Sequence, residues 1–228
     1  MIVSLCIPCG NRLHDLKRTM PYTVEAANSS PPIEIMILDY CSTDGLLEWL
    51  DQVKEDIGLS PANQFRFKRY SGRSSFHKAH AFNLSILSSV GEYFVLMGAD
   101  AYPEPGYVPE VRNLIAQDCI WMHAKDLCGI IACQRKEFVM AGGYDERFSL
   151  YGPEDRELDE RLQRRGGKFG LVPKGLMHVI RTPDEEKISN FGLKASKGQM
   201  SRMMRPILEE SRANSSLVAN PGGWGQWT

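Results

Sequence analysis

The stretch EIMILDYCSTDG, residues 34–45, decides the fold. Residues 34–38 form a short apolar run of the kind that becomes a buried strand. Residues 45–54 repeat leucine at helical spacing, which predicts a helix with one apolar face. The polar residues 39–44 join the two. A strand followed directly by an amphipathic helix is the unit from which parallel sheets are built.

The same alternation recurs along the first half of the chain. It predicts a parallel, doubly wound sheet flanked by helices, although Pro21 is expected to kink or restart the first helix. The pattern becomes less regular after Met97. The predicted strands are residues 2–7, 34–38, 65–69, 93–97 and 129–133, and the predicted helices are 13–27, 45–54, 76–89, 135–141, 153–165 and a final one from 194.

The helix over residues 153–165 has the clearest boundaries. Pro153 suits its first turn, acidic residues follow, and Gly166 and Gly167 end it. Two oppositely charged pairs are four residues apart, the spacing of neighbours on a helix surface, and both are expected to face solvent. They are Glu157 with Arg161 and Glu160 with Arg164.

Composition excludes several classes of protein. The 228 residues are 43% hydrophobic and 24% charged, which is typical of a globular chain and not of a disordered one. The formal net charge of −1 gives no overall attraction to nucleic acid or an acidic membrane. The longest apolar run, residues 93–99, is far shorter than a membrane span, and residues 1–10 are interpreted as a strand and not a signal peptide. A soluble, cytoplasmic protein is therefore expected.

The six cysteines show no spacing typical of a disulfide framework or a zinc site, so reduced thiols are expected. Cys6 and Cys9 form a C-x-x-C sequence, which is also found in redox proteins. Redox chemistry needs a thiolate at the start of a helix, whereas this pair lies on the predicted first strand. A redox function is kept only as a minor alternative.

Polar residues directly follow several predicted strands. Ligands of open α/β sheets bind beyond the carboxyl ends of the strands, so these residues are the first candidates for a site. Taken singly, each segment is equally well explained as a helix cap or a turn. The segments are Pro8–Arg12, Asp39–Gly45, Gly98–Asp100 and His178–Arg181.

Six segments in this order resemble the GT-A glycosyltransferases, namely family 2 in the first half and the galactosyltransferase-type family 7 in both halves. They cover residues 2–182 and read IPCGNRLHDL, EIMILDYCSTDG, FHKAHAFNLSI, EYFVLMGADAYPEP, GGYDERFSLYGPEDRELDERL and LMHVIR. The resemblance implies an α/β GT-A fold with a mostly parallel sheet in a single domain, 1–182. Its nucleotide-sugar half is 1–100 and its acceptor and catalytic half 101–182, followed by a helical extension, 183–213, and a flexible tail, 214–228.

The resemblance also implies a UDP-sugar donor and the residues that bind it. Asp39 is similar to the carboxylate that reads the base, Arg12 to the arginine near the diphosphate, and Asn83 to a family asparagine. The segment 66–80 holds five basic residues and no acid, which would suit donor phosphates. The full set of expected donor-binding residues is Pro8, Asn11, Arg12, Asp39, Arg73, Lys78, Asn83 and Ala99.

A divalent cation and basic residues would stabilise the departing nucleotide diphosphate. Asp100 resembles the second acid of the family's D-x-D motif, and His178 resembles a second metal ligand. This donor set favours Mn²⁺, with Mg²⁺ as the other choice. Gly98 stands where the family has its first aspartate, so Asp100 could also act through water. A lone histidine in an apolar run is otherwise a common core residue.

Asp155 and Glu154 are the catalytic candidates. An acceptor hydroxyl is a poor nucleophile until a base takes its proton. By resemblance Asp155 is the base of an inverting transfer and Glu154 is its neighbour, although acids are also simply favoured at helix starts. Tyr151 stands where the family often has tryptophan and could stack on a sugar, with Gly152 beside it in the acceptor site.

The sequence therefore predicts a metal-dependent, inverting transfer of galactose, N-acetylgalactosamine or glucose from a UDP-sugar to a saccharide hydroxyl. Two alternatives stay open. DNA could instead bind to the basic segments 66–80 and 194–212, with Trp224 and Trp227 stacking on bases. The acceptor would then be a hydroxymethylated base. Gly98 is also compatible with a sugar-nucleotide-binding protein that has lost catalysis.

Overall fold

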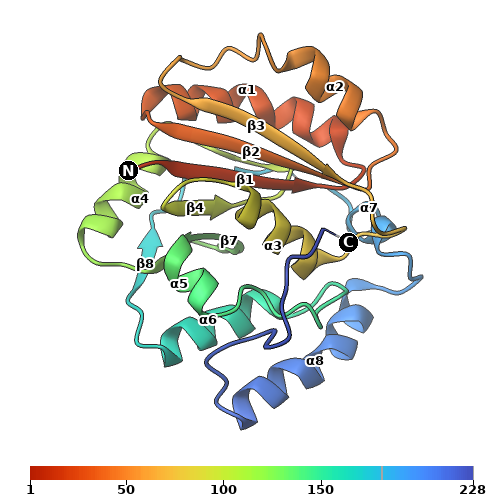
Figure 1. Cartoon of the computed structure of the whole chain (residues 1–228). Helices are drawn as coiled ribbons and strands as arrows, with labels where there is room; N and C mark the ends of the chain where they lie inside the picture. The colour runs from red at the N-terminus through yellow and green to blue at the C-terminus, as the bar shows by residue number, and fades with distance from the viewer. Residues whose placement is uncertain (181, 228) are drawn as a thin grey trace.

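A seven-stranded sheet runs through the molecule in the order β3-β2-β1-β4-β7-β6-β8 (Figure 1). The computed structural model describes residues 1–180 and 182–227. Strands β3, β2, β1 and β4 are parallel, as are β6 and β8, whereas β7 is antiparallel to both of its neighbours. The predicted α/β class with a mostly parallel sheet is confirmed. The strands are β1 Val3–Cys9, β2 Ile33–Tyr40, β3 Gln64–Tyr70, β4 Tyr93–Leu96, β6 Trp121–Ala124, β7 Leu127–Gln134 and β8 Phe169–Val172.

Helices cover both faces of this sheet (Figure 1). Alternate residues of a strand point to opposite faces, so Leu5 packs with Leu16 and Leu46 while Cys6 packs with Ile86 and the helices beyond it. Among residues 1–180 and 182–227, no helix combines the length and apolar character needed to cross a bilayer. The helices are α1 Leu13–Ser29, α2 Leu46–Val53, α3 Lys78–Ser88, α4 Tyr107–Ala116, α5 Arg135–Met140, α6 Glu154–Arg164, α7 Asp184–Ile188, the 3₁₀ helix η1 Ser189–Phe191 and α8 Lys197–Ala213.

A second, two-stranded sheet links the two halves of the chain beside the large sheet. Its strands are β5, Ala101–Pro103, and β9, Met177–Val179, which are antiparallel with Ala101 opposite Val179. The backbone N–H of Ile180 donates to Asp100 O at 2.7 Å. The late segment 176–180 is therefore fixed beside the end of β4. Arg181, which the sequence placed in the same segment, lies outside the described residues.

One expected surface pair on α6 is buried, which corrects the sequence interpretation. Glu157 and Arg161 are 1% and 0% exposed and form a two-pronged ion pair. Ser211 of α8 donates to Glu157 at 2.8 Å, and Arg161 donates to the carbonyl of Ala141. The pair was expected in solvent because the spacing alone did not show that α8 packs over it. Glu160 and Arg164 stay partly exposed.

The segment 214–227 lies along the domain and is not the free tail that its composition predicted. Asn220 Nδ2 donates to Gly142 O at 2.8 Å and Tyr144 O at 2.7 Å, and Trp224 packs edge-on against Phe138. The carbonyl of Gln226 bonds to the His80 ring at 2.9 Å. Scattered asparagine and tryptophan contacts of this kind have no periodic pattern that the sequence could reveal.

Cys6 and Cys9 are free and fully buried on β1. Burial raises the pKa of the Cys6 thiol to about 12, and it raises the pKa of Cys9 as well. Neither sulfur is therefore a thiolate at neutral pH, which is the reactive form in redox exchange. Both cysteines serve as core residues, and the redox alternative has no support in the structure.

Candidate active site

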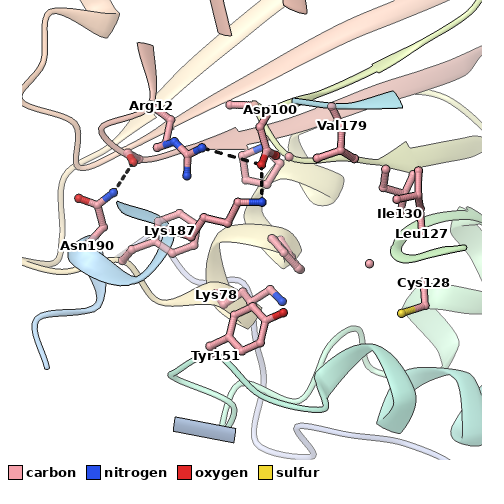
Figure 2. A pocket seen from close by; sticks show the side chains of 18 of the residues that line it. Arg12, Lys78, Asp100, Leu127, Cys128, Ile130, Tyr151, Val179, Lys187 and Asn190 are labelled. Atoms are coloured by element: carbon pink, nitrogen blue, oxygen red, sulfur yellow. Dashed lines mark hydrogen bonds and ion pairs between the residues drawn. The ribbon is translucent and has the colours of Figure 1, made fainter. Parts of the chain in front are cut away.

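A cavity of about 410 Å³ opens at the carboxyl ends of β1 and β4 (Figure 2). Parallel strands end together at one edge of a sheet, which is where ligands of α/β folds bind. The size lies in the usual range for a small-molecule site. Six of the residues expected from sequence line it together: Pro8, Arg12, Lys78, Ala99, Asp100 and Tyr151.

Arg12, Asp100 and Lys187 form one end of the cavity (Figure 2). Lys187 Nζ is 2.9 Å from Asp100 Oδ2, and Arg12 Nη2 is 3.8 Å from the same oxygen. Arg12 also pairs with the buried carboxylate of Asp15. Two cations thus surround one accessible carboxylate, an arrangement suited to phosphate oxygens.

Gly98 is shaped by its neighbour Asp100. A Cβ at Gly98 would lie 2.6 Å from Asp100 Oδ1, so any larger residue there would displace the carboxylate. Asp100 can fold back over residue 98 because that residue is a glycine and not an aspartate.

Lys78, Glu154 and Asp155 form a charged cluster at the other end. Lys78, at the start of α3, pairs with Glu154 and lies 3.9 Å from Asp155 Oδ2. Glu154 is 0% exposed, and burial raises its pKa to about 7 although Lys78 acts in the opposite direction. Burial disfavours the charged form of Lys78, but Glu154 and Asp155 outweigh it and raise the pKa of the ammonium.

Asp155 reaches the cavity wall on β7. A Cβ at Gly129, which lines the cavity, would lie 3.7 Å from Asp155 Oδ2. The hydroxyl of Tyr144 donates to Asp155 Oδ1 at 3.3 Å. Burial raises the pKa of Tyr144 well above its ordinary value, so this phenol stays protonated as a donor. Asp155 is not itself part of the cavity lining: Tyr144 holds its Oδ1, and its Oδ2 lies next to the lining residues Gly129 and Lys78.

Tyr151 stands beside this cluster with cations near its ring. Lys78 Nζ is 4.7 Å and Lys197 Nζ is 5.0 Å from the ring centroid. Gly152 does not line the cavity: a Cβ there would lie 2.7 Å from Met204, and its N–H donates to Glu154 at 3.1 Å. Its role is to let α8 pack closely over the start of α6.

Several expected donor residues lie outside the cavity lining. Asn83 is buried and its amide bonds both the N–H and the carbonyl of Tyr144, so it fixes the loop before α6. Asn11 holds the next loop through the N–H of Thr43 at 2.7 Å. Arg73 is exposed. In this structure Asn83 and Asn11 form hydrogen bonds with backbone groups, and spacing in the sequence could not show these contacts.

Asp39 is also separated from the cavity lining. It is 0% exposed, accepts from the N–H of Ser42 at 3.1 Å and lies 3.5 Å from Arg69. Burial raises its pKa. Its Oδ2 accepts no hydrogen bond from the described residues. Reading of a base by Asp39 stays a prediction, and it needs movement of the loop that covers the carboxylate.

His178 and Asp100 are not brought together. On β9 it is Val179 that lines the cavity, while His178 Nε2 is 3.0 Å from Glu104 and its ring stacks on Tyr102. Neighbouring residues of a strand point to opposite sides, which explains the separation. The expected pair of metal ligands is therefore not formed in this structure.

Asp100 alone fits a divalent cation in the cavity. Mg²⁺ commonly binds one or two carboxylates together with substrate phosphates and water, so a single aspartate is sufficient when a diphosphate is present. His14, Asp15 and Glu186 form another group of possible metal ligands, because their ligand atoms all lie within 4.8 Å of one another. Arg12 already pairs with Asp15 there, so that group is a poor choice for a cation.

Three of the five basic residues in the segment 66–80 form ion pairs within the molecule. Arg66 pairs with Glu34 at 3.1 Å, Arg69 with Asp39 and Lys78 with Glu154. Trp224 is packed against the domain, so it is not free to stack on bases. These contacts do not favour a DNA acceptor.

Lys187, Asn190 and Phe191 line the cavity and were missed from the sequence. They belong to α7 and η1, in the segment expected to be an extension outside the domain. Asn190 Nδ2 donates to Gly10 O at 2.8 Å. A lone lysine and asparagine in a polar stretch carry no signal of a site; only the return of the chain to β1 reveals them.

Two family models match the chain. Residues 4–125 match the model described as glycosyl transferase family 2, and residues 119–185 match the one described as the N-terminal domain of galactosyltransferase. Both agree with the resemblance drawn from the sequence segments, which is confirmed. A comparison with curated protein sequences gave no match.

Solved glycosyltransferases share the fold at low sequence identity. A mannosyltransferase of Pyrobaculum calidifontis with GDP-Man and Mn²⁺ has a TM-score of 0.70 at 15% identity, covering 96% of this chain and 66% of its own. The glucosyl-3-phosphoglycerate synthase of Mycobacterium tuberculosis with Mn²⁺ and UDP gives 0.64 at 16%, covering 97% and 82%. A Drosophila galactosyltransferase 7 variant with manganese, UDP-Gal and xylobiose gives 0.59 at 14%, covering 90% and 79%.

These similar structures are glycosyltransferases crystallised with Mn²⁺ and a nucleotide or nucleotide sugar. At such identities they show the GT-A fold and not the substrates of this chain. The family 2 model covers more than half of the 228 residues. The chain therefore belongs to glycosyl transferase family 2 and is a glycosyltransferase.

Proposed function

We propose that the protein transfers a hexose from a UDP-sugar to a hydroxyl group of a saccharide, with inversion at the anomeric carbon. One observation carries the proposal: a single cavity is lined by Arg12 and Lys187 at one end and by Lys78 and Gly129, the neighbours of Asp155, at the other. A leaving diphosphate needs positive charge, and an acceptor hydroxyl needs a base. The cavity offers both.

Asp155 acts as the base. It takes the proton of the acceptor hydroxyl as that oxygen attacks the anomeric carbon from the side opposite the diphosphate. The bond between the anomeric carbon and the phosphate oxygen breaks, and UDP leaves with the electron pair. This single displacement inverts the anomeric carbon. Tyr144, which donates to Asp155 Oδ1, fixes the carboxylate so that Oδ2 is free to accept the proton.

Arg12 and Lys187 bind the diphosphate. Each would donate charge-assisted hydrogen bonds to phosphate oxygens, and both already face Asp100 in the cavity. A Mn²⁺ or Mg²⁺ ion held by Asp100 would supply Lewis-acid stabilisation of the leaving UDP. The expected role of His178 as a ligand requires rearrangement of its contact with Glu104.

The acceptor binds between Tyr151 and the apolar residues of β7. Leu127, Cys128 and Ile130 line this side of the cavity (Figure 2). Aromatic and aliphatic surfaces suit the apolar face of a sugar ring. Glu154 does not touch the cavity; it positions Lys78, whose ammonium lies beside the base.

A product screen tests the proposal. The protein is incubated with Mn²⁺ and isotope-labelled UDP-galactose, UDP-N-acetylgalactosamine or UDP-glucose, and with saccharide acceptors or DNA that carries hydroxymethylated bases. Mass spectrometry is expected to show one hexose added to a saccharide, and NMR coupling constants are expected to show the inverted anomer. A retained anomer would contradict the single displacement. Transfer to DNA alone would contradict the saccharide acceptor.

A further inference from the structure

The segment Asp184–Phe191 crosses the donor end of the cavity (Figure 2). Lys187 reaches Asp100 from α7, and Asn190 of η1 bonds to Gly10 at the end of β1. The carbonyl of Asn190 also accepts from the N–H of Phe76 at 2.7 Å. The segment thus touches the ends of β1 and β4, where the proposed diphosphate binds.

Polar contacts hold this segment in place, with little apolar burial. No residue of α7 is buried, and Phe191 is the one buried residue of η1. Single hydrogen bonds and partly exposed ion pairs each contribute little net free energy to folding. Lys187 can therefore change partners without disturbing the core.

Lys187 and a divalent cation would compete for the same oxygen. Lys187 Nζ lies 2.9 Å from Asp100 Oδ2, and Arg12 approaches that oxygen from the other strand end. A metal ion on this oxygen would stand about 2 Å away, so it would meet the ammonium at close range. Gly98 offers no second carboxylate to hold the ion elsewhere. Like charges this close repel strongly in a partly buried site.

We propose that Lys187 is a donor-binding residue that neutralises Asp100 in the free protein and moves to the diphosphate when a metal ion and the nucleotide bind. The inference rests on the proposed function, because it assumes a nucleotide diphosphate as ligand. The diphosphate supplies the negative charge that the ammonium loses when it leaves Asp100. Metal binding without nucleotide is weak for this reason, and metal and nucleotide bind cooperatively.

Equilibrium binding to purified protein tests the inference without turnover. Free Mn²⁺ is measured by electron paramagnetic resonance without nucleotide, and UDP binding is measured by calorimetry in saturating Mn²⁺. Lys187→Ala is expected to bind Mn²⁺ alone more tightly, by about threefold, because its competitor is gone. The same variant is expected to bind UDP more weakly, by about tenfold, because a charged hydrogen bond is lost.

Two further variants separate charge from structure. Lys187→Arg keeps the cation and is expected to stay within roughly twofold of the parent for both ligands. Lys54→Ala, on α2 and paired with Asp51 outside the cavity lining, is expected to change neither. A merely structural role for Lys187 would weaken both ligands together, whereas the inference requires changes of opposite sign.

Each remaining result counts against the inference. Equal Mn²⁺ affinity of Lys187→Ala and the parent, or no Mn²⁺ binding to either, refutes the competition at Asp100. Unchanged UDP affinity refutes the diphosphate role. A parent protein that binds no UDP at all would instead contradict the proposed function, so the two failures are distinguishable.

Discussion

The two ends of the cavity are built differently. At the acid end, Glu154 is 0% exposed and the first turn of α6 is fixed by Lys78, Tyr144 and the packing of Met204 on Gly152. At the donor end, Lys187 belongs to a helix in which no residue is buried. Its partner Asp100 is partly exposed.

The difference indicates that the acid end contributes mainly to folding stability and the donor end mainly to ligand binding. Removing one partner of a buried ion pair is strongly destabilising. We therefore expect the acid end to have the same structure with and without ligand. The pair of Lys187 and Asp100 is only partly buried, so it stabilises the fold less and Lys187 can exchange Asp100 for a diphosphate. We therefore expect substitutions at the acid end to affect folding strongly and substitutions at the donor end to affect binding.

The largest stability effect is expected for Lys78→Ala. Above pH 7, where Glu154 is ionised, it leaves this carboxylate buried without its cation, which costs about 3–5 kcal/mol of unfolding free energy. Urea denaturation followed by circular dichroism measures the change. The double variant Lys78→Met with Glu154→Gln removes both charges and should recover most of the loss. Equal destabilisation in the single and double variants would show that the ion pair is not the cause.

A smaller, pH-dependent effect is expected from Glu154. Burial raises its pKa from an ordinary value of 4.5 to about 7, so the folded protein keeps a proton in this window that the unfolded chain releases. The unfolding free energy therefore falls as pH rises through this window. Glu154→Gln should flatten this part of the stability profile. A profile with the same slope in both proteins would contradict the assignment to Glu154.

The smallest effect on stability is expected for Lys187→Ala. The side chain is 27% exposed and its pair with Asp100 lies at the cavity rim, so the unfolding free energy should change by less than about 1 kcal/mol. The same denaturation experiment gives the value. A loss comparable to that of Lys78→Ala would remove the contrast between the two ends.

Much of the fold could be predicted because its signals are local. The apolar runs that became β1, β2, β3 and β4 lie between helices with regular spacing, and that alternation has few solutions other than a parallel sheet. Glu157 and Arg161 show the limit. Their spacing is that of a surface pair, and only the later packing of α8, with Ser211 on Glu157, buries them.

Site residues that directly follow a strand could be predicted from the sequence, and the others could not. Pro8, Arg12 and Asp100 stand at strand ends and line the cavity, while their binding of donor or metal stays a prediction. Lys187 comes from a segment far along the chain with no periodic pattern, so its place depends on tertiary structure alone. His178 was assigned by resemblance, and a difference of one residue along β9 turns Val179 to the cavity in its place.

The assignment of Asp155 as the base is the central claim, and one comparison tests it most directly. Asp155→Asn keeps the shape of the side chain and removes the proton acceptor. Transfer of labelled hexose should fall by about 10²–10⁴-fold while UDP affinity, measured by calorimetry, stays at the parent value. Asp51→Asn, on α2 and exposed, serves as the matched control. Transfer by Asp155→Asn at the parent rate would contradict the account.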